Sequence, residues 1–371
     1  MAKSEKLYLI TTNAEAGAME TLPVTEGMEV ISSADLVRSD LFFTPDMKVM
    51  ISSEACIETI KGRMDDSRRK VIEVLKDKYE FRKIISPIFP DFYFQLVGAE
   101  GITNLKINRK SVIKPVKGCF GTAVRIIEPE TNMEVLKSEL MSELHQNGAV
   151  LSEDVLSTET FLVEQFIKGE EYAVDMFYDA KGEPCIVNIY HHPMPLNKSY
   201  LHMMYNSSKK VFDRIYGQAV AFFRSLNEIL KVKNFAMHSE FIEDSGKLLP
   251  VEMNTMRFGG MGLGNMGYHA IGLNSYASFM DDIEPDWDQI WQGKGEDVFS
   301  YFIGYNAVGK SVLEYKPNRE KLKQQFTQVL LERSFDYQKQ LTFGVYCLKE
   351  TEERIGELLK IEFGDYFEKI N

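Results

Sequence analysis

The sequence has few cysteines, no targeting segment and no long apolar run, and each absence argues against a class of protein. Its four cysteines are scattered, without a Cys-x-x-Cys pair or clustered histidines: Cys56, Cys119, Cys185 and Cys347. Such spacing argues against a zinc site or a disulfide framework and is typical of the cytoplasm, where we expect the protein. The only early apolar run, Leu7–Ile10, is too short for a signal-peptide core. No run approaches the roughly 18 apolar residues of a spanning helix, so we expect no membrane association.

Basic residues are also in deficit. Lysine and arginine number 43 against 55 aspartates and glutamates, which gives a net charge of −12. A chain of this charge lacks the electrostatic footprint of a nucleic-acid or anionic-membrane binder, so we expect neither partner. Glycine and proline, 25 and 12 of 371 residues, are too few for a collagen-like or broadly disordered chain. The length predicts two or three domains with a large core.

Helical and extended patterns alternate along the chain. Helical spacing or composition predicts helices over Ser67–Lys83, Met133–Asn147, Lys209–Leu230, Asn318–Arg333 and Glu350–Ile361. Short β-rich segments predict strands over Lys6–Thr11, Met28–Ser32, Met47–Ile51, Phe161–Ile167, Tyr172–Tyr178, Ala236–Glu243, Lys247–Asn254 and Leu341–Cys347, and two more within Ser111–Glu128. Several of these form hairpins, which argues against an all-parallel sheet. The sequence therefore predicts an α+β fold, with an α/β part at the N-terminus.

Acidic and amide side chains concentrate in the hairpin after Ala236. Side chains alternate along a strand, so Glu252 and Asn254 share a face, as do His238 and Glu240. A three-residue turn would pair Glu240 with Pro250 and put it one diagonal from Glu252. Two carboxylates and an amide oxygen suit Mg²⁺, a hard cation that prefers oxygen ligands. The alternative is a solvated hairpin face with two ordinary glutamates.

Two further segments carry polar groups that suit a nucleotide. Lys114 ends a strand before a loop with Gly118 and Gly121, where an ammonium and backbone N–H groups can surround phosphate oxygens. The apolar strand from Phe161 is broken by Lys-Gly, so its backbone can pair with an adenine edge while Glu171 accepts ribose hydroxyls. Each segment, taken alone, is better explained by core strands and a turn with surface charges.

In this order the segments resemble the ATP-grasp superfamily, which includes biotin carboxylase, D-alanine–D-alanine ligase and the L-amino-acid ligases. The resemblance covers about half the chain, from Asp77 to about Gly264, and rests on an ordered set. That set is Lys78, Lys114, Glu164, Glu171, Glu240, Glu252 and Asn254, with successive spacings of 36, 50, 7, 69, 12 and 2 residues. It implies an ATP-grasp fold in which two α+β subdomains clasp ATP after a small α/β domain.

The resemblance also implies roles for these residues. Lys78 and Lys114 match the phosphate-binding lysines, and Gly118 and Gly121 lie in the loop that closes over the phosphates. Glu164 and Phe166 match the linker that recognises adenine, and Glu171 matches the acceptor of the ribose hydroxyls. The Mg²⁺ ligands are matched by Glu240, Glu252 and Asn254, and Mn²⁺ can take the place of Mg²⁺. Arg257 looks like the arginine that steadies the substrate or acyl phosphate, although it stands three residues after Asn254 rather than two. The loop Gly-Cys-Phe-Gly is bulkier than the family's usual loop.

A competing nucleotide motif lies near the C-terminus. Gly304–Ser311 satisfies the pattern G-x-x-x-x-G-K-[ST] of a P-loop. A P-loop needs a helix that begins at Lys310, and only 60 residues follow Ser311, too few for a P-loop domain. We therefore expect no phosphate site there. His191 and His192 end a strand and either pack structurally or border a substrate pocket.

These inferences converge on an ADP-forming, ATP- and Mg²⁺-dependent ligase that joins a carboxylate to an amine, of the amino-acid or peptide type, through an acyl phosphate. Lys114 and Arg257 are the expected catalytic residues, and small-molecule carboxylates and amines the expected substrates. The alternatives are an ATP-grasp carboxylase or small-molecule kinase, or a non-catalytic ATP-binding protein. The expected domains are 1–75, an ATP-grasp core over 76–285 (76–166 with the lysines, 167–285 with the metal site) and an extension over 286–371. A homodimer is considered because the first domain is short.

Overall fold

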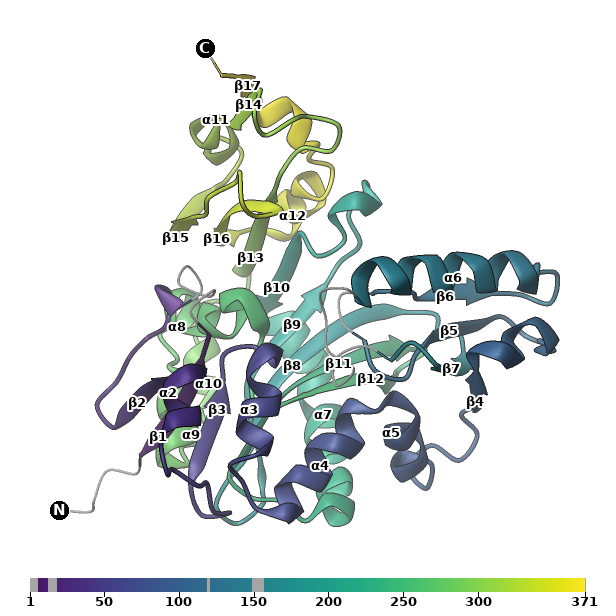
Figure 1. Cartoon of the computed structure of the whole chain (residues 1–371). Helices are drawn as coiled ribbons and strands as arrows, with labels where there is room; N and C mark the ends of the chain where they lie inside the picture. The colour runs from purple at the N-terminus through teal and green to yellow at the C-terminus, as the bar shows by residue number, and fades with distance from the viewer. Residues whose placement is uncertain (1–5, 13–18, 119–120, 149–156, 371) are drawn as a thin grey trace.

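The computed structural model describes residues 6–12, 19–118, 121–148 and 157–370, with the side chains of 146–148 left aside. Its N-terminal part is a parallel sheet of three strands in the order β2-β1-β3. The strands are β1 (Leu7–Thr11), β2 (Met28–Ser32) and β3 (Lys48–Ile51). Short helices α2 (Ser33–Arg38), η2 (Glu54–Cys56) and α3 (Ile57–Lys61) accompany them. All three predicted strands are confirmed, and this sheet lies on one side of the molecule (Figure 1).

The helix predicted over Ser67–Lys83 is in fact two helices, α4 (Asp66–Lys76) and α5 (Lys78–Ile85). Asp77 breaks the helix with an extended conformation, φ −88° and ψ 108°, and its carboxylate accepts the N–H groups of Tyr79 and Glu80. The helical spacing continues through the break, but the N-capping aspartate starts a new axis. The break places Lys78 at the start of α5, where its backbone N–H donates to the Val116 carbonyl at 2.8 Å.

A second, four-stranded sheet follows in the order β4-β7-β5-β6. Its strands are β4 (Phe94–Gly98), β5 (Ser111–Pro115), β6 (Arg125–Ile127) and β7 (Thr160–Gln165), with η3 (Ala99–Asn104) between β4 and β5. Helix α6 (Met133–Gly148), close to its predicted bounds, covers one face of this sheet (Figure 1). Leu136, Leu140 and Leu144 of α6 join the apolar core beneath it.

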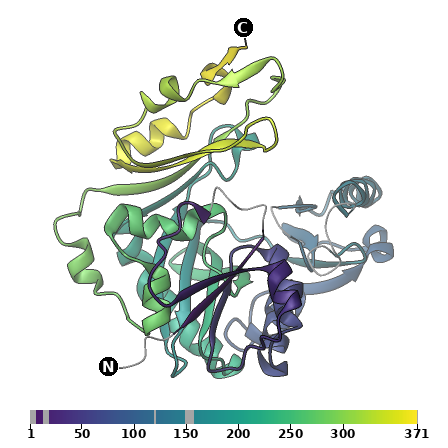
Figure 2. The ribbon, with the colours of Figure 1, turned by 60° about the vertical axis from the view of Figure 1, so that its left-hand side comes forward.

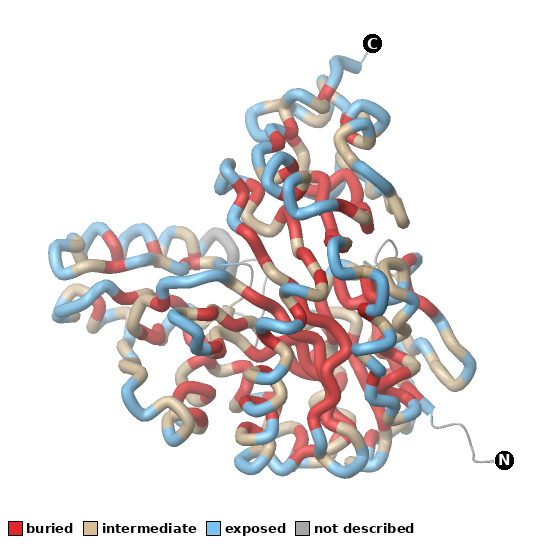
Figure 3. Tube along the Cα trace, turned by 180° about the vertical axis from the view of Figure 1, so that it is seen from behind, coloured by how far each residue is buried: buried red, intermediate tan, exposed pale blue. Residues whose placement is uncertain are grey.

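The centre of the molecule is an eight-stranded antiparallel sheet in the order β12-β11-β8-β9-β10-β13-β16-β15. Its strands are β8 (Glu170–Tyr178), β9 (Pro184–His192), β10 (Met204–Ser208), β11 (Phe235–Asp244), β12 (Lys247–Thr255), β13 (Val298–Tyr305), β15 (Gln328–Ser334) and β16 (Thr342–Glu350). Most of its backbone is buried, as the red strands of Figure 3 show. Helix α7 (Lys209–Leu230) has its predicted bounds, and its buried face includes Phe212, Ile215 and Phe223. No helix of the described residues is long and apolar enough to cross a membrane.

Shorter elements complete the chain. They are η4 (Lys198–Tyr200), η5 (Gly260–Asn265), α8 (Met266–Ile271), α9 (Ser275–Asp281), α10 (Trp287–Trp291), β14 (Tyr315–Pro317), α11 (Arg319–Lys323), α12 (Glu352–Leu358), η6 (Phe363–Tyr366) and β17 (Phe367–Lys369). The C-terminal segments form a lobe around strands β13, β15 and β16 at one end of the central sheet, which Figure 2 shows from the side. The core of this lobe includes Phe302, Phe343, Tyr346 and Phe363.

The helix predicted over Asn318–Arg333 is wrong for most of its length. Only Arg319–Lys323 is helical, and Gln328–Ser334 forms the edge strand β15 against β16. Thr327 turns the chain between them, with its N–H and hydroxyl both donating to the Glu350 carboxylate. The favourable helix composition is overridden because pairing with β16 satisfies the backbone of this segment.

The P-loop-like segment has no phosphate-binding architecture. Gly304 lies within β13, and the chain after Lys310 turns into β14 without forming a helix. The Lys310 ammonium donates to the Gly364 carbonyl at 2.5 Å and lies 5.0 Å from the Tyr315 ring centroid. A helix N-terminus directed at the loop is therefore absent from this described segment, as the sequence predicts.

The cysteines of the described residues form no disulfide. Cys56, Cys185 and Cys347 are buried, and burial raises the pKa of Cys185 and of Cys347 to about 12. Thiols with pKa values this high remain protonated at neutral pH and are poor nucleophiles. Cys119 lies outside the described residues.

Candidate functional site

The β11–β12 hairpin brings two glutamates directly opposite one another, in a register that differs from the predicted one. The turn has two residues, Ser245 and Gly246, so Asp244 pairs with Lys247. A bulge at Val251 then shifts the register, so that Glu240 pairs with Glu252 rather than with Pro250. The prediction of a diagonal contact was wrong because it assumed a three-residue turn and an unbroken ladder.

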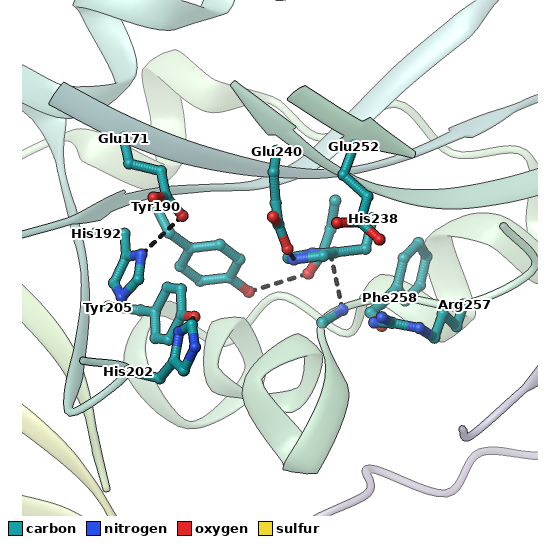
Figure 4. A network of polar contacts seen from close by, with 12 residues as sticks. Glu171, Tyr190, His192, His202, Tyr205, His238, Glu240, Glu252, Arg257 and Phe258 are labelled. Carbon is teal, nitrogen blue, oxygen red and sulfur yellow. Dashed lines mark hydrogen bonds and ion pairs between the residues drawn. The ribbon is translucent and has the colours of Figure 1, made fainter. Parts of the chain in front are cut away.

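His238 pairs with Asn254 on the same face, so the three expected metal ligands lie together. Figure 4 shows Glu240 and Glu252 projecting side by side from their strands. Burial and the charges of Glu252 and Glu171 raise the pKa of Glu240 to about 7, against the opposing effect of His238 and Arg257.

The donor set fits a divalent cation. Two adjacent carboxylates that repel one another are stabilised by a positive charge between them, and oxygen-only ligands suit Mg²⁺. Glu240, Glu252 and Asn254 supply two carboxylates and one amide oxygen. Within the described ranges, no cluster of three or more His, Cys, Asp or Glu side chains is arranged as a metal site. A cation here would therefore need further ligands from water or substrate.

Lys78 links the metal-ligand face to the glycine loop. Its ammonium lies 3.2 Å from Glu252 Oε1 and donates to the Gly118 carbonyl at 2.9 Å. The structure thus brings together three residues that lie far apart in sequence. Gly121 has a positive φ of 68°, in the left-handed region that favours glycine. Cys119 and Phe120, which make the loop bulkier than expected, lie outside the described residues.

Lys114 and Glu164 form a buried charge cluster with Arg82, a residue that the sequence did not single out. Glu164 Oε1 lies 2.6 Å from the Lys114 ammonium, and Oε2 accepts a 2.6 Å bond from Arg82 Nε. Burial opposes ionisation, but the two cations lower the pKa of Glu164 to about 2. Arg82 also donates to the Pro250 carbonyl at 2.6 Å, so the cluster joins β7 to β12.

Phe166 and Glu171 follow β7 toward the central sheet. The Phe166 N–H donates to the Lys110 carbonyl at 3.1 Å, and the Lys110 ammonium lies 4.8 Å from the Phe166 ring centroid. Glu171 projects from β8 to the same side as Glu240 (Figure 4). Its Oε1 accepts a 2.8 Å hydrogen bond from His192 Nδ1.

Asp175 is a fully buried carboxylate that organises the metal-ligand strand, and it is not among the residues predicted from the sequence. Its Oδ1 accepts bonds from His238 Nδ1 at 2.7 Å and from the Gly259 N–H at 2.8 Å. Its Oδ2 lies 3.1 Å from the amide of Asn188 and from the Tyr190 hydroxyl. One side chain thus holds β11, β9 and the glycine-rich loop after β12. Side chains alternate along β8, so Asp175, four residues after Glu171, lies on the same face as Glu171. That alternation is the sequence signal that could have identified it.

Arg257 faces the N-terminal part of the chain. Its Nη2 lies 3.0 Å from Glu54 Oε1, and Glu54 Oε2 lies 2.7 Å from the Lys76 ammonium. Burial opposes ionisation, but the two cations lower the pKa of Glu54 to about 2. The adjacent Met256 carbonyl accepts a bond from the Ile51 N–H, which ties this loop to β3. No sequence motif indicates Glu54, because its partners are 22 and 203 residues away.

Comparisons with known proteins show which domain and which folds this chain resembles. Residues 107–265 match the model of the ATP-grasp domain. An L-amino acid ligase from Bacillus licheniformis is 15% identical with a TM-score of 0.67, over 100% of this chain and 99% of that one. N5-carboxyaminoimidazole ribonucleotide synthetase from Thermotoga maritima is 14% identical with a TM-score of 0.61, over 99% of both chains. Biotin carboxylase from Campylobacter jejuni is 15% identical with a TM-score of 0.60, over 95% of this chain and 90% of that one.

A search of curated proteins by sequence found no significant match. At these low identities the solved structures establish the fold, while the domain model covers the segment that contains most of the site. The α+β prediction is confirmed: the chain has the fold of these ATP-grasp enzymes, and its residues 107–265 match the model of the ATP-grasp domain.

Proposed function

We propose that the protein is an ATP- and Mg²⁺-dependent ligase that joins a carboxylate to an amine and releases ADP and phosphate. The observation that carries this proposal is the meeting of Lys78 with Glu252, directly opposite Glu240. A lysine beside paired carboxylates suits a phosphate chain bound together with a divalent cation. The similarity in fold to an L-amino acid ligase supports the same reaction class.

In the proposed site, residues from two sheets surround the nucleotide. Lys78 and Lys114 would contact its phosphates, with the loop that includes Gly118 and Gly121 closing over them. Glu164 and the backbone near Phe166 would border the adenine. Because Glu164 already binds Arg82 and Lys114, its proposed contribution is to hold Lys114 in place as well as to border the base.

The chemistry follows from the weak reactivity of a carboxylate toward amines. Transfer of the γ-phosphoryl group to the carboxylate oxygen makes an acyl phosphate; the amine then attacks the carbonyl carbon, and phosphate leaves. Catalysis of this kind depends on positioning and on neutralising charge. Lys114 would neutralise charge on the phosphates, and Arg257, anchored by Glu54, would hold the acceptor carboxylate.

Glu240, Glu252 and Asn254 are the proposed ligands of the cation. A bound Mg²⁺ supplies positive charge next to the phosphate oxygens. Burial and the repulsion from Glu252 and Glu171 raise the pKa of Glu240 to about 7, and a cation between the two carboxylates would relieve that repulsion.

The test is ADP release from Mg-ATP with pooled amino acids and other carboxylates, with hydroxylamine present to trap acyl phosphates. ADP together with a hydroxamate is the expected result. Glu252→Gln should lower turnover by about 10²–10³, the usual loss when an electrostatic partner is removed. Glu183→Gln, which alters an exposed pair with Arg224, is the matched control and should retain full activity. Wild-type turnover in the Glu252 variant would contradict the proposal.

A carboxylase is the second candidate, because the similar structures include biotin carboxylase and N5-carboxyaminoimidazole ribonucleotide synthetase. ADP release that requires bicarbonate would favour it. A stable phosphorylated product would instead indicate a kinase, and ATP binding without ADP release would indicate a non-catalytic protein.

We also propose that the chain divides into domains at residues 75/76 and 285/286. A homodimer is a further proposal, and sedimentation at micromolar concentration tests it.

A further inference from the structure

His192, at the end of β9, has a hydrogen-bond acceptor on each ring nitrogen. Nδ1 lies 2.8 Å from Glu171 Oε1, and Nε2 lies 3.0 Å from the Leu201 carbonyl oxygen. The residue is only 2% exposed, so water cannot replace either partner. A carbonyl and a carboxylate cannot donate, so both contacts are satisfied only when the imidazole carries a proton on each nitrogen. The geometry therefore requires the imidazolium form and makes Glu171–His192 a largely buried ion pair.

The ring is also fixed in orientation. It stacks on Tyr205 of β10, with ring centroids 4.3 Å apart and planes inclined by 8°, and on His202 at 5.3 Å and 13° (Figure 4). His202 Nδ1 lies 3.2 Å from the Tyr205 hydroxyl, which links these two rings to one another. An imidazole that is stacked on two rings and bonded at both nitrogens has little freedom to rotate.

The charged surroundings favour the protonated ring. Burial opposes protonation of His192, but Glu171 on β8, the Leu201 carbonyl and the more distant Glu240 on β11 together raise its pKa. Burial and the charge of His192 lower the pKa of the neighbouring His202 imidazole. The His192 imidazolium therefore pairs with the Glu171 carboxylate. The neighbouring His202 ring is neutral at neutral pH, so it adds no second positive charge.

Glu171 is held through one oxygen only. Its contact with His192 uses Oε1, while Oε2 makes no side-chain hydrogen bond within the described part of the chain. The side chain is 29% exposed, on the face that carries Glu240 and Glu252. The carboxylate is thus anchored at its back, with one oxygen available to an incoming hydroxyl group.

We propose that His192 is a positioning residue for nucleotide recognition: it holds Glu171 so that the free oxygen accepts a ribose hydroxyl. The inference rests on the proposed function, because the ribose role of Glu171 belongs to that proposal. It adds a residue outside the ordered lysine and glutamate set and gives the stacked rings a task in substrate binding.

The test compares binding of Mg-ATP and Mg-2′,3′-dideoxy-ATP, which lacks both ribose hydroxyls, by titration calorimetry. His192→Asn keeps an amide donor near the position of Nδ1, whereas His192→Gln moves the donor toward Nε2 and the Leu201 carbonyl. The two variants lose the same stack, so they form a matched pair. Wild type should bind ATP about tenfold more tightly than the dideoxy analogue, as expected for one hydrogen bond to a charged group. The preference should survive in His192→Asn and disappear in His192→Gln, with affinity for the analogue unchanged.

An equal preference in both variants would overturn the inference. Glu171→Gln separates it from the proposed function: if that variant loses the ATP preference while both His192 variants keep it, the ribose assignment holds and the role of His192 falls. If Glu171→Gln keeps full preference, the ribose assignment itself is wrong.

Nitrogen NMR of the wild-type protein covers the case in which the variants do not fold. Nδ1 of His192 should carry the proton that it donates to Glu171. An Nδ1 without a proton would overturn the inference, because the ring could not then hold Glu171.

Discussion

Glu164→Gln should destabilise the lysine-bearing part of the protein strongly. The side chain is 3% exposed, and its two oxygens lie 2.6 Å from the cationic groups of Arg82 and Lys114. The substitution preserves shape but leaves two buried cations without their anion. Breaking a buried pair in this way costs about 3–5 kcal/mol. The lowering of the Glu164 pKa from 4.5 to about 2 gives a similar figure, about 3 kcal/mol at about 1.4 kcal/mol per tenfold change in ionisation.

The assay is urea unfolding followed by far-ultraviolet circular dichroism. The matched control is Glu100→Gln, which removes an ion pair with Lys137 in the same region; the Glu100 side chain is 95% exposed. Exposed pairs contribute little, so the control should unfold at the wild-type midpoint. If Glu164→Gln also unfolds at that midpoint, the reasoning about the buried cluster is refuted.

The same pair predicts a pH dependence with a definite sign. Because the folded-state pKa of Glu164 lies below its usual value, its contribution is fully present above pH 4.5 and is lost as pH falls toward about 2. The difference in unfolding free energy between wild type and Glu164→Gln should therefore shrink over that window. A difference that stays constant down to pH 2 would contradict the assigned charge state.

Three further predictions follow from individual contacts. Gly169→Ala should lower the unfolding midpoint, because a Cβ there would clash with the Glu243 carbonyl oxygen. Gly217→Ala in α7 has open space around it and should raise stability by about 0.5–1 kcal/mol. Equal unfolding midpoints for the two variants would contradict this reasoning. Glu54→Gln should raise KM for the carboxylate substrate about tenfold and leave KM for ATP unchanged, because it weakens the ion pair that anchors Arg257. An equal rise in both constants would contradict the role of Glu54 in positioning Arg257. Lys310→Ala should leave ATP affinity unchanged, since its ammonium binds the Gly364 carbonyl; a loss of affinity in calorimetry would restore the P-loop interpretation.

Local chemistry made much of the fold predictable. The apolar face of α7 recurs at helical spacing over the whole segment, so its bounds could be read from the sequence. The three N-terminal strands are short apolar runs separated by turn residues, and their bounds were recovered within one residue. Predictions failed where a distant partner decides the outcome. Gln328–Ser334 is a strand because β16 lies beside it. The break in the helix predicted over Ser67–Lys83 has a local cause instead, because Asp77 caps the N–H groups of Tyr79 and Glu80 while the helical spacing runs on through it.

The candidate site shows the same division. The order and spacing of Lys78, Lys114, Glu240 and Glu252 are properties of the sequence, and they were enough to indicate the superfamily. The register of the hairpin could not be read from the sequence, because the turn has two residues instead of the assumed three and one bulged residue moves every later pair by one position.

What the sequence by itself determined is therefore which chemical groups are present and on which local elements they lie. Only the tertiary structure decided their partners: Arg82 with Glu164, Glu54 with Arg257, and His192 with Glu171. The physical reason is that charge pairing in a buried site acts through distances of a few ångströms, whatever the separation along the chain. Periodicity and propensity act between near neighbours in sequence and carry no information about those distances.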